Sequence, residues 1–108
     1  RADGKFIEIG RENASSDALQ FAPDETTPSL LDGEVFVTGV NTKATAITNF
    51  TDAEAGIVYT IYGNGSENAS TIASGGNFVL TEAITLSEGK FIKLAKAADG
   101  KFYEVARG

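Results

Sequence analysis

Two short apolar runs flank an Ala-Asp-Gly turn near the end of the chain, between Gly89 and Arg107. This composition is typical of a β-hairpin, because strand-forming runs joined by a glycine-containing turn pair antiparallel. With 97–100 as the loop, the register places three pairs opposite each other: Ile92 and Val105, Leu94 and Tyr103, and Lys93 and Glu104. The pattern therefore predicts a hairpin with one apolar face and a cross-strand ion pair between Lys93 and Glu104 on the other.

The second strand of that hairpin has a near copy at the other end of the chain. The segment 98–107 reads Ala-Asp-Gly-Lys-Phe-Tyr-Glu-Val-Ala-Arg, and the segment 2–11 reads Ala-Asp-Gly-Lys-Phe-Ile-Glu-Ile-Gly-Arg. Because the alternation is the same, 5–9 predicts another strand. The chain begins with Arg1 beside this repeated motif, which suggests a processed product or a piece of a longer protein.

Two interpretations of the N-terminal copy stay open. It is either the closing strand of a preceding unit in a tandem array or a strand that extends the sheet of this domain. We favour the second, because leaving Ile7 and Ile9 exposed would forgo roughly 1.5 to 3 kcal/mol of burial free energy each.

Between the two copies, segments rich in Val, Ile, Thr, Phe and Tyr are separated by turns at intervals of about 8 to 12 residues. The expected strands are Glu34 to Val40, Thr45 to Phe50, Ile57 to Tyr62, Thr71 to Ala73, Phe78 to Leu80 and Ile84 to Leu86, followed by the hairpin strands Lys90 to Ala95 and Lys101 to Arg107. Only 51–55 and 81–83 suit helical turns in this body. We expect an all-β fold of short antiparallel strands, in a sandwich, jelly-roll or prism-like module.

A chain of 108 residues is expected to be a single β domain covering 1–108. Residues 1–33 would form a strand and a long extended connection, and 34–108 the β-rich body. Within the connection, 18–21 suits one helical turn capped by Ser16. Because so long a loop is uncommon in a compact domain, it is either a linker or a crossover packed on the body or on a neighbouring chain.

Three phenylalanines lie on the strand faces opposite the expected core residues: Phe6, Phe91 and Phe102. When strands are apolar on both faces, the face opposite the core must also be shielded from water. These residues are therefore candidates for an oligomer interface in a trimer. Alternatively, the connection 11–33 covers the second face.

The residue types that are missing exclude several kinds of chemistry. The chain has no His and no Cys, so the commonest general base and the thiolate metal ligands are absent. We expect a protein that is not an enzyme and that carries no cofactor. The net charge of −6 argues against nucleic acid as a partner, and no apolar run reaches the roughly 20 residues of a membrane span.

Clustered oxygen atoms offer weaker candidates for a site. The carboxylate pairs are Asp24 and Glu25, Asp52 and Glu54, and Glu8 and Glu104, and solvated charge explains them better than acid–base catalysis. Calcium would need Asp52 and Glu54, or Glu67 in the loop 64–68, but neither place has the spacing of a dedicated calcium loop. Tyr59 alternates with core positions, whereas Tyr62, Asn64 and Asn68 remain as candidate contacts to a surface glycan.

A series of features runs in order from Ile47 to the end of the chain: Ile-Thr-Asn-Phe at 47–50, Gly-Ile-Val-Tyr-Thr-Ile-Tyr-Gly at 56–63, Ser-Thr-Ile-Ala at 70–73, Gly-Gly-Asn-Phe-Val-Leu at 75–80, the strand 84–86, and Phe-Tyr-Glu-Val-Ala-Arg at 102–107. In this order, the last 60 or so residues resemble the small β-rich modules of tailed-phage virion proteins, found at the C-terminal ends of tail spikes and fibres and in head-decoration proteins. Residues 1–33 have no counterpart in that resemblance.

The resemblance implies a trimeric, non-enzymatic module that serves assembly, stability or attachment. Its partners would be further copies of itself and other virion proteins, and its location the virion or an extracellular surface. The alternative is a bacterial cell-surface module that binds carbohydrate through Tyr62 and the loop 63–68.

Overall fold

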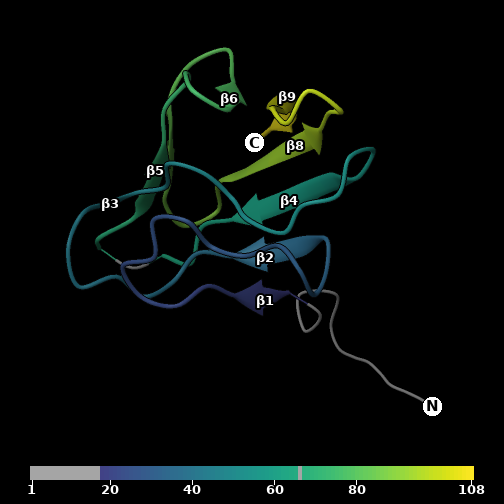
Figure 1. Ribbon diagram of the computed structural model, residues 1–108. Coiled ribbons are helices and arrows are strands. Elements are labelled where there is room, and N and C mark those ends of the chain that lie inside the picture. Colours follow the sequence, from purple (N-terminus) through teal and green to yellow (C-terminus); the bar gives the residue numbers. More distant parts are fainter. Residues whose placement is uncertain (1–17, 66) are drawn as a thin grey trace.

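The computed structural model describes residues 18–65 and 67–108, and every regular element among them is a strand (Figure 1). The strands are β1 (Leu19–Gln20), β2 (Val35–Val37), β3 (Thr45–Ala46), β4 (Val58–Tyr62), β5 (Ser70–Ile72), β6 (Phe78–Val79), β7 (Ile84–Leu86), β8 (Phe91–Lys96) and β9 (Phe102–Arg107). The all-β prediction is confirmed. Among these residues, no helix is long and apolar enough to cross a membrane.

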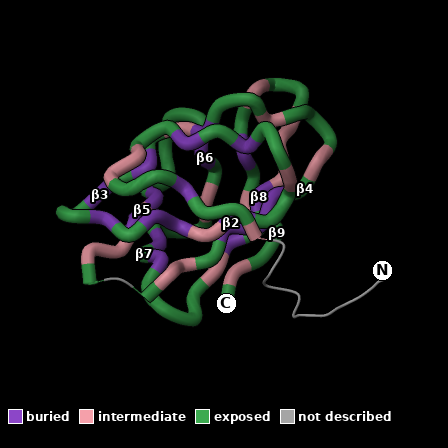
Figure 2. The backbone as a smooth tube through the Cα atoms, turned by 90° about the horizontal axis from the view of Figure 1, so that it is seen from below, coloured by how far each residue is buried: buried purple, intermediate pink, exposed green. Residues whose placement is uncertain are grey.

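The strands form a six-stranded sheet in the order β1-β2-β4-β8-β9-β6 and a three-stranded sheet in the order β3-β5-β7. Figure 1 shows the larger sheet rising from β1 through β2 and β4 to β8, and Figure 2 shows β3, β5 and β7 grouped together. From β2 to β8 the chain changes sheet at every step. Two strands of one sheet can run in the same direction when the chain crosses to the other sheet between them. In this way β2 pairs parallel with β4, and β3 pairs parallel with β5.

The prediction of antiparallel strands is confirmed for three of the seven described strand pairings and wrong for the other four. Only β4–β8, β5–β7 and β8–β9 are antiparallel, whereas β1–β2, β2–β4, β3–β5 and β6–β9 are parallel. Local alternation indicates that a segment is a strand but carries no information about which distant strand it meets.

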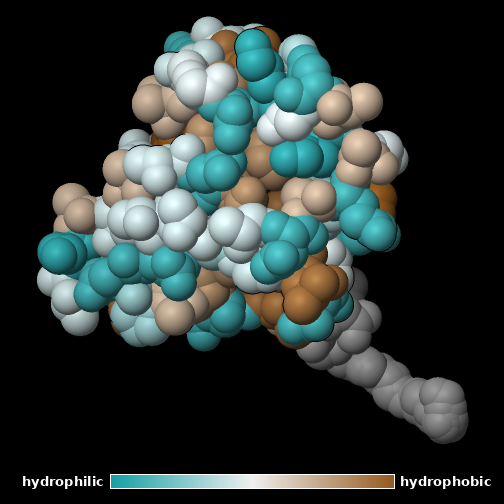
Figure 3. Space-filling view, in the orientation of Figure 1, coloured by the Kyte–Doolittle hydropathy of each residue, from teal (hydrophilic) through white to brown (hydrophobic). Residues whose placement is uncertain are grey.

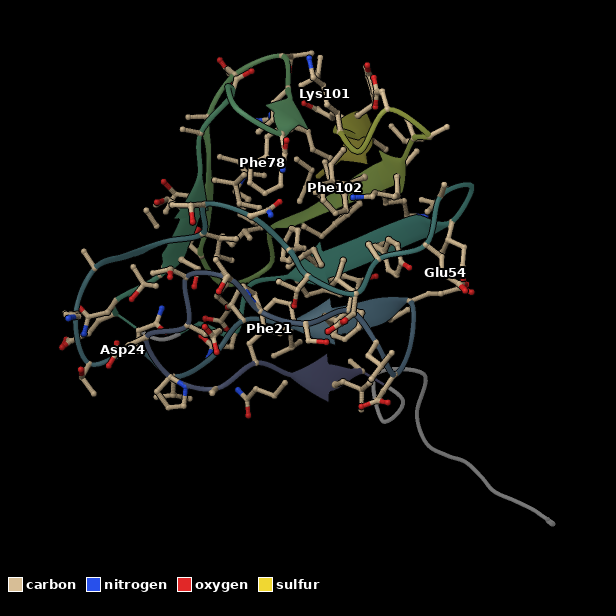
Figure 4. The ribbon with its side chains drawn as sticks, viewed as in Figure 1. Phe21, Asp24, Glu54, Phe78, Lys101 and Phe102 are labelled. Atoms are coloured by element: carbon tan, nitrogen blue, oxygen red, sulfur yellow. The ribbon has the colours of Figure 1, made fainter. Side chains whose placement is uncertain are left out.

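One hydrophobic core joins the two sheets (Figure 2). It combines β4 and β8 residues with β5 and β7 residues, and also takes in residues from the loops. Phe50, from a loop, lies at the centre of an aromatic cluster, with ring centroids 5.9 Å from Phe21, 5.6 Å from Phe78 and 5.4 Å from Phe102. Figure 4 labels three of these rings, which come from opposite ends of the sequence.

The hairpin β8–β9 is confirmed, but its predicted register is wrong. Lys96 pairs with Phe102, Leu94 pairs with Glu104, and a bulge at Val105 shifts the remaining pairs, so Lys93 lies opposite Ala106. The loop is one residue shorter than expected, because the amide of residue 97 donates to the Lys101 carbonyl at 2.9 Å and so pairs these two residues. The Lys93–Glu104 pair is therefore not formed.

A shift of one residue exchanges the two faces of a strand. Phe102 is fully buried in the core, while Tyr103 is 38% exposed and Val105 is 57% exposed. The side chains of β9 therefore point to the faces opposite those predicted for them. Phe102 packs against the other phenylalanines, and the Tyr103 hydroxyl donates to Asp99 Oδ2 at 2.6 Å on the surface.

The described part of the long connection, 18–33, packs on the body as a crossover. Its residues 18–21 do not form a helical turn: Leu19 and Gln20 form β1, which pairs parallel with β2. Phe21 and Leu30 both belong to the core. Residues 1–17 lie outside the described part, and with them the predicted strand 5–9, Ile7, Ile9, the capping residue Ser16 and the fate of the terminal repeat.

Asn41, only 6% exposed, ties three segments together through hydrogen bonds. Its side-chain amide donates to the Asn68 carbonyl at 2.8 Å and to Ser70 Oγ at 3.0 Å. Its Oδ1 accepts a bond from the Asp24 amide at 2.8 Å. The loop after β2 is thus fastened to the start of β5 and to the connection after β1.

Candidate functional site

The outer face of the six-stranded sheet carries several exposed apolar residues. Core side chains alternate along β2, β4, β8 and β9, so the residues between them point away from the core. Strand pairing lines these residues up in rows. We define the outer face by Val35, Val37, Val58, Thr60, Tyr62, Val79, Phe91, Lys93, Ala95 and Tyr103.

This outer face is apolar over most of its extent. Val58, Val79 and Tyr62 are 42%, 41% and 40% exposed, and Lys93 is the one charged residue in the defined set. Contiguous exposed apolar patches on soluble proteins often mark interaction sites.

Other exposed apolar residues lie away from the outer face. In Figure 3 the visible side mixes hydrophilic and hydrophobic residues, with a small brown patch near the ends of β1 and β2. Leu31, in the loop before β2, is 70% exposed, and Val40, in the loop after β2, is 59% exposed. Val40 therefore offers a matched exposed valine outside the strands.

Tyr62 and Phe91 form an aromatic pair at one end of the outer face. They face each other across β4 and β8 with ring centroids 5.5 Å apart. Phe91 also exchanges two backbone hydrogen bonds with Gly108, at 3.1 and 3.2 Å. Both residues thus lie at the surface, as expected from the sequence.

The candidate glycan contacts next to Tyr62 take part in bonds within the fold. The Asn68 side chain donates to the Asn41 carbonyl at 3.2 Å, and the Asn68 carbonyl accepts the Asn41 amide. The amide of Asn64 donates to Thr38 Oγ1 at 3.2 Å. The structure therefore assigns Asn68 a role in closing the 63–68 loop onto the body.

The candidate interface residues separate into different environments. Phe91 lies half-buried on the outer face, whereas Phe102 is enclosed in the core and offers no surface to another copy. Phe6 lies outside the described residues. Tyr103, which the sequence predicted to lie in the core, occupies the outer face instead. The Asp-Gly turn, in which Asp99 Oδ1 accepts the Lys101 amide, was the local signal for this shift.

Glu104 and Arg107 bind the segment after β6 and form a side-chain clasp. Glu104 Oε1 accepts bonds from the Thr81 amide at 2.9 Å and hydroxyl at 3.1 Å, while its carboxylate pairs with the Arg107 guanidinium at 2.8 and 2.9 Å. Arg107 also donates to the Glu82 carbonyl at 2.7 Å. The Arg107 guanidinium and the Thr81 donors lower the pKa of Glu104 to about 2.

Acid should weaken this clasp, because the pKa of Glu104 is lower in the folded chain than its ordinary value. Its contribution to stability is complete above about pH 5 and is lost as the pH falls toward 2. We expect Glu104→Gln to lower the free energy of unfolding by about 2 kcal/mol at pH 7, since bonds to a charged group are lost. Urea titrations at pH 7 and pH 3 should show the difference between parent and variant shrinking at the lower pH, and an equal difference at both would contradict it.

Four carboxylates surround a hollow of about 340 Å³ beside Tyr59, namely those of Asp32, Glu34, Asp52 and Glu54. The Asp52 carboxylate accepts a bond from Ser29 Oγ at 2.6 Å, and the Glu54 amide donates to the Tyr59 hydroxyl at 2.9 Å. Among the described residues, no group of three or more potential ligands is arranged to hold a metal ion. Asp24 lies at the other end of the molecule (Figure 4), where Thr42 bonds lower the pKa of its carboxyl.

Comparison with protein-family models, with curated proteins and with solved structures finds no match for this chain.

Proposed function

We propose that this chain is a non-enzymatic structural module of a phage or prophage particle, which assembles through the outer face of its six-stranded sheet. The observation that carries the proposal is the apolar character of that face in a chain whose core already lies on the sheet's other side. The location on a virion, in a capsid decoration or a tail fibre or spike, rests on the resemblance of 47–107 to modules of that kind. The absence of His and Cys supports a role without catalysis.

The partner that we propose for the outer face is a second and a third copy of the chain. A closed symmetric assembly uses the same surface on every copy, and three such faces around an axis exclude water from one another. Lys93 is the one charge in the set that defines the face, and it is positive on a chain with a net charge of −6. A positive charge there reduces the repulsion between acidic copies at the contact.

A charge on the outer face should abolish self-association. We expect the parent chain to sediment as a trimer at micromolar concentration and Val58→Glu to sediment as a monomer, because burying an unpaired carboxylate costs several kcal/mol. Val40→Glu is the matched control, since Val40 is 59% exposed but lies outside the strands. A monomeric parent, or loss of association in the control alone, would contradict the proposed interface.

The location on a particle can be tested separately from assembly. Antibodies against the chain should label purified phage particles by immunogold electron microscopy. Labelling confined to the bacterial cell surface would overturn the proposed location and favour the alternative function.

That alternative is a cell-surface carbohydrate-binding module, and one observation favours it. The exposed Tyr62–Phe91 pair offers aromatic surface next to a polar loop, as sugar-binding sites do. Against it, the Asn68 side chain is used within the fold. A glycan array would show binding that is lost in Tyr62→Ala if this module binds sugar, and no binding if the chain is a virion part.

A further inference from the structure

Lys93 and Thr60 lie at the centre of the outer face. They pair across β4 and β8, the two middle strands of the six-stranded sheet, and each stands near the middle of its strand. Val35 continues their row on one side and Ala106 on the other. The one charged residue of the defined face is therefore at its centre and not at its rim, where a lysine side chain reaches water easily.

Apolar rows lie on both sides of this central row. On one side Val58 faces Ala95, and on the other side Tyr62 faces Phe91. Each apolar row is two residues from the central row along the strands, a distance of about 6.6 Å. When another copy covers the outer face, these rows therefore shield the central row from water. A charge that is cut off from water is costly unless it has a partner.

Neither polar group of the central row has a partner within the described part of the chain. Thr60 is only 9% exposed, yet its hydroxyl makes no hydrogen bond with the described residues. Lys93 is exposed and pairs with no carboxylate among them, since the ion pairs of these residues belong to Arg107. Buried hydroxyl groups in proteins are usually hydrogen-bonded. Both groups are thus available to a ligand.

Three outer faces around one axis bring their centres closest to that axis. In this assembly, which rests on the function proposed above, the Lys93 side chains of three copies point toward one another, with the three Thr60 hydroxyl groups beside them. Three ammonium groups in such a place repel one another, because the apolar rows exclude the water that would weaken the repulsion. The contact between the copies is therefore incomplete without an anion.

We propose that the trimer binds a small inorganic oxyanion, of the phosphate or sulfate class, on its three-fold axis. The Lys93 ammonium and the Thr60 hydroxyl of each copy hold it. A tetrahedral oxyanion matches this symmetry, since three of its oxygen atoms are equivalent about the axis through the fourth. Hydrogen bonds from ammonium groups to such oxygen atoms are charge-assisted and therefore strong. Because the site needs all three copies, the anion favours assembly.

Titration calorimetry of the parent chain with inorganic phosphate tests the proposal, with the ionic strength held constant by sodium chloride. We expect one phosphate per three chains, and a melting midpoint about 5 °C higher in millimolar phosphate than in chloride alone. Lys93→Met should abolish binding and leave the chain trimeric, because methionine is apolar and unbranched. Lys101→Met is the matched control, since Lys101 is exposed in the β8–β9 turn, and it should bind phosphate as the parent does.

The outcomes of this experiment separate the anion site from the proposed assembly. A trimer that binds no phosphate, or that binds it equally well after Lys93→Met, would overturn the anion site and leave the interface in place. A parent chain that stays monomeric with and without phosphate would overturn both.

Thr60→Val tests the hydroxyl group, because valine keeps the shape of the side chain and removes the donor. We expect it to weaken phosphate binding by at least about tenfold while the trimer persists. Unchanged affinity in this variant would overturn the assignment of Thr60 to the site.

Discussion

Replacing Phe102 with alanine is expected to lower the free energy of unfolding by about 3 to 5 kcal/mol, which corresponds to a fall of about 20 °C in the melting midpoint. The ring is fully buried against Phe50 and Phe78. It also lies 4.6 Å below the Lys96 ammonium, so its removal leaves a cavity and weakens the Lys96 contact. Thermal unfolding followed by circular dichroism measures the effect.

Tyr103→Ala is the matched control for this substitution. The register that the sequence predicts makes Tyr103 the core residue, whereas the observed register makes it a surface residue that is 38% exposed. We expect the control to cost about 1 kcal/mol, mainly through the lost bond to Asp99. A larger loss for Tyr103→Ala than for Phe102→Ala would show that the observed register of β9 is wrong.

The second large effect is expected for Asn41→Ala, at about 3 kcal/mol of unfolding free energy. The substitution leaves the Asp24 amide, the Asn68 carbonyl and Ser70 Oγ without their partner, at a site that is buried at Ser70 and partly buried at the other two. Each buried group that loses its hydrogen bond lowers the free energy of unfolding by about 1 to 3 kcal/mol. A water molecule that binds the same group reduces this loss. Urea denaturation at pH 7 provides the measurement.

Asn77→Ala is the control, because its side chain makes one exposed bond, to Asn49 at 3.0 Å. It should change the unfolding free energy by no more than about 0.5 kcal/mol. Equal losses for the two asparagines would contradict the role assigned to Asn41.

The sequence predicts those parts of the fold that depend on neighbouring residues. The strand 84–86 is found with the bounds expected for it, and Tyr59 and Ile61 lie in the core as their alternation indicates. The expected strand 34–40 shortens to 35–37, because Thr38 and Asn41 turn inward as buried polar residues that bond to loops. Such bonds join segments more than 20 residues apart, which no local pattern contains.

The candidate site was predicted only in outline. The idea that the hairpin strands are apolar on both faces is supported, and Phe91 lies outward as expected. The predicted turn between β8 and β9 differs from the observed turn by one residue, and this difference decides which faces of the sheet Phe102 and Tyr103 occupy. Because the side-chain period of a strand is two, that single residue exchanged a core residue and a surface residue.

The alternation of successive strands between the two sheets has a consequence for how the chain reaches its fold. Val35 pairs with Thr60 and Thr45 with Ser70, so each of these parallel pairs must close a loop of 25 residues (60 − 35 and 70 − 45). Contacts between residues far apart in sequence slow folding, since chain entropy is lost before they form. The larger sheet is completed by β9, at the very end of the described chain, which inserts between β8 and β6. During synthesis, the core therefore stays open until β9 has left the ribosome.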